Sequence, residues 1–288
     1  MVQRQPELFA DGLVFGEGMR WYGGRLWMSD MLGRKVYSFD EVGQRRIEAT
    51  VPERPNGLGF LPSGALVTTS MADQKLLRMT SDGSLAEHAD LSHLMTGYCG
   101  DMAVDAQGRA YLDDVGFRVF EGEPPAPGRL LLVQADGSAS VLESGLQFPN
   151  GMAITQDGKE LIFAEGRNRK IWSYELADDG TFASKSLFSE TEDLLDGMTL
   201  DVEGGVWQCM PYRNEIVRYL RGGRITQRIP FGALKPVACA LGGHERRILY
   251  VVVCDYSIER MARDDTTAQI FAVDVDVPGF ALPGDRAA

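Results

Sequence analysis

The sequence has few of the residues that carry common enzyme chemistry. Its 288 residues include only 3 histidines and 4 cysteines. The cysteines, at positions 99, 209, 239 and 254, form no Cys-x-x-Cys pair, which excludes a zinc ribbon and a thioredoxin-type site. Phosphate-loop, dinucleotide-binding and Gly-x-Ser-x-Gly motifs are also missing. We therefore expect reduced, mostly buried thiols, and an activity that uses none of these motifs.

Long hydrophobic runs and clusters of basic residues are lacking as well. The purely apolar stretch at 248–254 is far shorter than the ~20 residues of a membrane-spanning helix. The formal net charge is -12, and Lys and Arg occur at most as isolated pairs, which argues against nucleic acid as a partner. No signal-like apolar core follows the first residues. The sequence predicts a cytoplasmic protein, monomeric or weakly dimeric, whose partner is a small-molecule substrate, with neither nucleic acid nor membrane involved.

What the chain does contain is an internal repeat. Four segments share an apolar strand followed by a Gly-rich or Asp-rich turn, and two degenerate copies flank them. The six copies lie at 17–24, 55–64, 99–108, 149–158, 195–204 and 236–243. Equivalent positions are 39 to 50 residues apart, and turn residues recur every 8 to 12 positions between β-rich runs.

This period is that of a propeller blade, which has four strands in ~40–45 residues. Six copies predict an all-β protein, a six-bladed β-propeller with four-stranded blades that fills residues 1–288 as a single domain. Only three strands follow position 236, so the segment from Leu8 to Val14 is expected to supply the fourth and to close the ring. A different blade number or a β-sandwich is the alternative.

The first strand of each blade lines the central channel of a propeller, so the repeat places one residue per blade at the channel mouth. These residues are Glu17, Asn56, Gly100, Asn150, Asp196 and Pro236. Converging carboxylate and amide oxygens suit a hard divalent cation such as Ca²⁺, Mg²⁺ or Mn²⁺, and Zn²⁺ also tolerates carboxylates. Asn-Gly and Asp-Gly are common turn dipeptides too, so three structural turns are the alternative interpretation.

Several motifs together resemble the SMP-30/gluconolactonase/luciferin-regenerating-enzyme family of six-bladed propellers over nearly the whole chain. They lie at 16–18 with Trp21 following, 55–58, 101–105, 108–111, 149–152 and 196–198. The resemblance implies that Glu17, Asn150 and Asp196 bind one divalent metal ion, with Ca²⁺ the first choice and Mn²⁺, Mg²⁺ or Zn²⁺ open. It also implies metal-dependent hydrolysis, most often of lactones.

The sequence departs from this family in its third blade. Gly100-Asp101 stands where the family often has Asn-Asp, and Asp113-Asp114 stands where many relatives have Gly-Asn. The family's Asn usually helps to hold metal-bound water or substrate. These departures leave open a changed substrate or a changed reaction.

Lactone hydrolysis needs a polarised carbonyl and a delivered water, and a metal ion supplies the first. Asp196 is the predicted general base as well as a metal ligand, and Asp101 is the second candidate base. The predicted substrate contacts, from their places in the repeat, are Arg20, Asn56, Tyr98, Met210 and Tyr212. Alternatives are lyase or phosphotriester chemistry on the same scaffold, or a propeller that binds a ligand without turnover.

Overall fold

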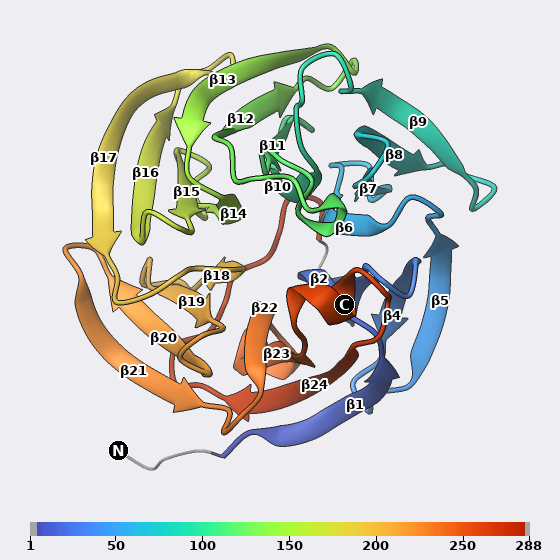
Figure 1. Ribbon diagram of the computed structural model, residues 1–288. Helices are drawn as coiled ribbons and strands as arrows, with labels where there is room; N and C mark the ends of the chain where they lie inside the picture. The colour runs from blue at the N-terminus through green and yellow to red at the C-terminus, as the bar shows by residue number, and fades with distance from the viewer. Residues whose placement is uncertain (1–4, 286–288) are drawn as a thin grey trace.

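The computed structural model describes residues 5–285, and these residues form six four-stranded antiparallel sheets in a ring (Figure 1). The predicted six-bladed propeller is therefore confirmed. The helical segments of residues 5–285 are short: η1 (Val119–Glu121), η2 (His244–Arg246) and α1 (Ile258–Met261). None of them approaches the length or apolarity needed to cross a bilayer.

Each of the first five blades consists of four consecutive strands. The first blade is β2 (Gly16–Tyr22), β3 (Arg25–Asp30), β4 (Lys35–Phe39) and β5 (Arg45–Thr50). The second is β6 (Pro55–Phe60), β7 (Leu66–Ser70), β8 (Lys75–Met79) and β9 (Leu85–Asp90). The third is β10 (Cys99–Val104), β11 (Ala110–Asp114), β12 (Gly128–Val133) and β13 (Ala139–Leu146). The fourth is β14 (Pro149–Ile154), β15 (Glu160–Glu165), β16 (Lys170–Leu176) and β17 (Phe182–Glu190). The fifth is β18 (Met198–Leu200), β19 (Val206–Met210), β20 (Glu215–Leu220) and β21 (Arg224–Pro230).

The sixth blade joins the two ends of the chain. It contains β22 (Lys235–Gly242), β23 (Ile248–Asp255) and β24 (Thr267–Asp274), and its outermost strand is β1 (Glu7–Leu13). β1 pairs antiparallel with β24, with Leu8 opposite Phe271. The predicted closing strand is confirmed, one residue earlier than expected at each end. Closure covers an edge of β24 that would otherwise present unpaired backbone groups.

Hydrophobic side chains fill the space between neighbouring blades. One cluster joins Trp207 and Ile216 of the fifth blade to Val251 and Val253 of the sixth, all of them almost fully buried. The four cysteines are likewise buried and free, as the sequence predicted. Burial of apolar faces on both sides of each sheet is what stacks the blades around the axis.

The six inner strands, β2, β6, β10, β14, β18 and β22, run in the same direction along the axis. Residues at their starts line one cavity and residues at their ends line another, so the channel has two distinct ends. In Figure 1 the turns of η1 (green) and α1 (orange-red) lie over the channel on the near side, and the red C-terminal segment crosses behind the ring. The direction of the inner strands therefore decides which motif residues can meet.

Ring closure can be tested with two leucines of β1. Leu13 is 4% exposed and belongs to the core, whereas Leu8 is 54% exposed. We expect Leu13→Ala to lower the free energy of unfolding by about 2–4 kcal/mol, because it leaves a cavity at the closing seam. Leu8→Ala should change it by less than about 1 kcal/mol. Denaturant titration of both variants measures the difference, and equal costs would contradict this account of closure.

Candidate active site

Glycines in the inner strands bring the site residues to the axis. The pairs Asn56-Gly57 and Asn150-Gly151 lie within β6 and β14, so they are not turns. A Cβ on Gly57 would stand 2.7 Å from the carbonyl oxygen of Gly100, and one on Gly151 would stand 2.6 Å from that of Asp196. Real Cβ atoms do not approach so closely. Each glycine therefore lets its strand pack against the backbone of the next blade, while the preceding side chain, on the opposite face of the strand, turns toward the channel.

A cavity of ≈ 210 Å³ opens at the end of the channel where the inner strands start. Seven of the nine predicted site residues line it, and they come from the first five blades. They are Glu17, Asn56, Tyr98, Asp101, Asn150, Asp196 and Tyr212. The fold thus brings together the three predicted metal ligands, which are up to 179 residues apart in the sequence (196 − 17).

The carboxylates in this cavity are short of positive partners. Glu17 accepts no hydrogen bond from residues 5–285, and its pKa is raised well above the usual value by burial and then by Asp196, Asp101 and Asp113. Burial also raises the pKa of Asp196 to about 7, and repulsion from Asp101 adds to this. A hydrogen bond from Asn150 opposes the shift. A divalent cation between these groups would stabilise their ionised forms.

The donor set fits a hard divalent ion. Among residues 5–285, no three His, Cys, Asp or Glu side chains converge closely enough to form a metal cluster by themselves. The set therefore consists of two carboxylates, Glu17 and Asp196, with the amide of Asn150. An asparagine amide has an acceptor oxygen besides its N–H donors, so Asn150 could offer that oxygen to a cation while its N–H serves Asp196. An all-oxygen set of this kind is the one that Ca²⁺, Mg²⁺ and Mn²⁺ prefer.

Two predicted substrate contacts do not line this cavity. Met210 is fully buried in the core between blades, because it ends β19, a second strand rather than an inner one. Arg20 lies three residues beyond Glu17 along β2, and at ~3.3 Å per residue this carries it toward the other end of the channel. Its Nη1 donates to the carbonyl oxygen of Met19 at 2.7 Å, and its Nη2 donates to that of Met102 and to Asp101 Oδ1.

An ion pair with this arginine holds the Asp101 carboxylate in place. Its Oδ1 lies 3.2 Å from Arg20 Nη2 and accepts the backbone N–H of Met102 at 2.8 Å. The same residue lines the cavity that contains Glu17 and Asp196. One edge of its carboxylate is thus anchored while the residue remains accessible from the cavity, as a proton acceptor has to be.

Two of the unusual residues of the third blade, Gly100 and Asp113, are next to each other in the structure. Asp113 Oδ2 accepts the backbone N–H of Asp101 at 2.9 Å, while its Oδ1 is buried without a hydrogen-bond partner among residues 5–285. A Cβ on Gly100 would lie 2.1 Å from that Oδ1. The Asp113 carboxylate therefore fills the space that a side chain at position 100 would take. The sequence marked both positions as unusual, but their contact is visible only in the fold.

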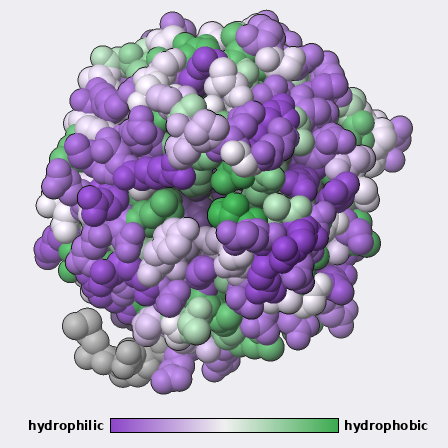
Figure 2. Space-filling model, viewed as in Figure 1, coloured by the Kyte–Doolittle hydropathy of each residue, from purple (hydrophilic) through white to green (hydrophobic). Residues whose placement is uncertain are grey.

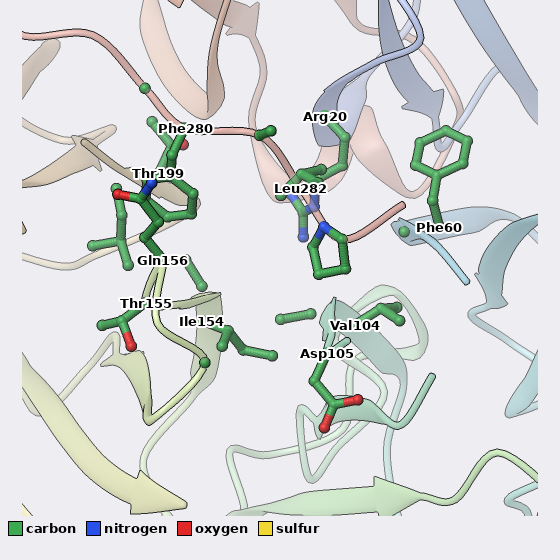
Figure 3. Close-up of a pocket in the computed structure, with 18 of the residues that line it drawn as sticks. Arg20, Phe60, Val104, Asp105, Ile154, Thr155, Gln156, Thr199, Phe280 and Leu282 are labelled. Carbon is green, nitrogen blue, oxygen red and sulfur yellow. The ribbon is translucent and has the colours of Figure 1, made fainter. Parts of the chain in front are cut away.

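The cavity at the opposite end of the channel is larger, at ≈ 350 Å³ (Figure 3). Arg20 and the C-terminal Phe280 and Leu282 lie around it. Among residues 5–285, the two carboxylates that line it already have partners. Asp105 pairs with Arg109 at 2.5 Å, and Asp157 accepts hydrogen bonds within its own turn. It offers no cluster of unpaired acids, so the smaller cavity is the candidate active site.

Comparison with known proteins identifies the family of this chain. The family model described as SMP-30/Gluconolactonase/LRE-like region matches residues 15–255. The chain belongs to this family.

Its relatives include named lactonases. It is 27% identical to pentonolactonase XacC of Haloferax volcanii, a match that covers 92% of each chain. It is 24% identical to 6-deoxy-6-sulfogluconolactonase of Pseudomonas putida, over 98% of this chain and 96% of that one. Among solved structures, the calcium-binding protein regucalcin of Agrobacterium tumefaciens superposes with a TM-score of 0.78 at 20% identity, covering 96% of this chain and 95% of the other. This last likeness establishes the shared fold.

The contact between positions 100 and 113 can be measured by a double-mutant cycle. We expect Gly100→Ala to cost about 1–3 kcal/mol of unfolding free energy, because the new methyl group meets the Asp113 carboxylate. In an Asp113→Ala background the same change should cost much less, since the space is then vacant. Denaturant titration of the four proteins gives the coupling. An identical cost in both backgrounds would show that the two positions do not compete.

Proposed function

We propose that this protein is a divalent-metal-dependent hydrolase of a lactone or related cyclic ester. The observation that carries the proposal is the meeting of Glu17, Asn150 and Asp196 in one cavity, where the carboxylates of Glu17 and Asp196 form no ion pair with any of residues 5–285. Membership of a family whose relatives are named lactonases supports the same reaction class.

The metal would be held by Glu17, Asp196 and the amide oxygen of Asn150. When bound, it would supply Lewis acidity that polarises the ester carbonyl. The protein itself must place the ester next to a water molecule and take up the proton that the water loses.

We assign the proton transfer to Asp101 in preference to Asp196, because Asp196 would be a metal ligand, and a carboxylate bound to a divalent ion is a weaker base than one paired with a single guanidinium group. Water adds to the carbonyl carbon and gives a proton to Asp101. The ring C–O bond then breaks, and the leaving alkoxide takes that proton from Asp101, which yields the hydroxy acid and restores the Asp101 carboxylate. Arg20 orients Asp101 without reaching the substrate, so it is a positioning residue.

Metal dependence is tested first. Chelator treatment should abolish hydrolysis of lactones, and titration with Ca²⁺, Mn²⁺, Mg²⁺ or Zn²⁺ should restore it. Glu17→Gln and Asp196→Asn should each reduce bound metal, measured by elemental analysis, by at least about tenfold, because each removes one of the two carboxylate ligands. Full activity in a preparation shown to be metal-free would refute the proposal.

The role of Asp101 needs a separate measurement. Asp101→Asn should retain the metal stoichiometry of the unmodified protein but lower kcat by about 10²–10⁴-fold, the range of a lost general base. Asp105→Asn is a matched control, since Asp105 faces the other end of the channel and pairs with Arg109. Should D101N lose metal instead, Asp101 would belong to the ligand set and the base would be Asp196.

A further inference from the structure

Above its oxygen-rich floor, the candidate active site has apolar walls. The side chains that surround the opening include Phe15, Met31, Met71, Phe148, Leu194 and Tyr256. Even Asn56, a predicted substrate contact, is surrounded by thioethers: its Nδ2 has the sulfur atoms of Met31 and Met71 as partners, at 3.7 and 3.8 Å. Sulfur is a weak acceptor, so this amide is poorly matched to its own surroundings.

Two loop insertions, 115–127 between β11 and β12 and 256–266 between β23 and β24, complete the apolar wall. η1 follows β11, α1 follows β23, and the two segments contact each other. η1 contributes Val119 and Phe120 to the cavity, and α1 contributes Ile258 and Met261. Ile258 is 41% exposed, so part of its apolar side chain is open to solvent beside the cavity. Figure 2 shows hydrophobic surface at the centre of this face, surrounded by hydrophilic surface.

Among residues 5–285, the polar side chains that line the cavity above its floor are those of Asn56, Arg167, Tyr98, Tyr212 and Tyr256. Arg167 is the one cationic side chain of residues 5–285 that lines the cavity, and its guanidinium carbon lies 5.2 Å from the ring centres of both Phe117 and Phe148. Its faces are thus occupied by aromatic rings. Hydroxyl groups of a sugar lactone that faced the apolar side chains would be buried without partners, and each such group costs about 1–3 kcal/mol.

We propose that the substrate is a cyclic ester with an alkyl or aryl substituent, held with its carbonyl at the oxygen floor and its substituent against the apolar wall. This inference rests on the proposed function for the ester itself. It rests on the wall residues for the substituent. The two insertions are then the elements that set substrate specificity.

A homologous substrate series tests the proposal in the metal-loaded protein. For γ-butyrolactones with 4-alkyl groups from methyl to hexyl, kcat/KM should rise about fourfold per added methylene until the wall is covered, the gain expected for burying one CH₂. Gluconolactone and a carboxylate-bearing sugar lactone should be slower than the hexyl compound by more than about tenfold. A flat or falling series, or preference for either sugar lactone, would overturn it.

Wall variants localise the effect. Ile258→Gln and Phe120→Gln should each lower the hexyl-to-methyl ratio of kcat/KM by about threefold to tenfold. Val42→Gln is the matched control, because Val42 is 77% exposed in the turn between β4 and β5, outside the cavity. An unchanged ratio in both wall variants would show that the insertions do not contact the substituent.

A binding measurement separates this inference from the proposed function. Alkyl-substituted γ-lactams have the same shape but no cleavable ester, and their affinity can be measured by calorimetry. If no lactone is hydrolysed while lactam affinity rises with chain length, the proposed hydrolysis fails and the apolar specificity stands. If lactones are hydrolysed but neither series depends on chain length, the apolar specificity fails and the hydrolase remains.

Discussion

The structure depends on the close approach of neighbouring inner strands around one axis. Glycines at 57 and 151 make that approach possible, because a Cβ at either position would collide with a carbonyl oxygen of the next blade. The residue before each glycine consequently lies at the channel. One steric requirement, repeated from blade to blade, thus packs the ring and also assembles the site.

This arrangement buries several acidic side chains, and burial of an ionised carboxylate costs free energy. Glu17, Asp196, Asp101 and Asp113 occupy one partly desolvated region, and burial is the first cause of the raised pKa of Glu17, Asp113 and Asp196. A fold tolerates such a region only when the rest of the structure holds it in place. Here the hydrophobic seams between blades and the closing strand β1 do so.

In the third blade, a side chain of the second strand packs beside a glycine of the inner strand. The carboxylate of Asp113 on β11 takes the space next to Gly100 on β10. The insertions that carry η1 and α1 vary the site in another way, since they alter the walls and leave the oxygen floor intact.

Much of the architecture could be predicted from the sequence, because it is written in local patterns. The spacing of the repeat gave six blades, and the missing fourth strand after position 236 pointed to β1. The same alignment of copies placed Glu17, Asn150 and Asp196 at one end of the channel. Two predicted substrate contacts do not line this cavity. Arg20 lies too far along β2, and Met210 ends a second strand and packs in the core between blades. The repeat pattern alone shows neither the height of a side chain in the channel nor the packing of a second strand.

The sequence by itself determined the ring and the set of polar residues that reach its axis, because strand periodicity and glycine positions are properties of each copy alone. Only the tertiary structure decided how those residues are matched to their surroundings. The fit of Asp113 beside Gly100, the anchoring of Asp101 by Arg20 and the meeting of η1 with α1 all join segments from different parts of the ring. Such contacts depend on side-chain packing in three dimensions, which no single segment encodes.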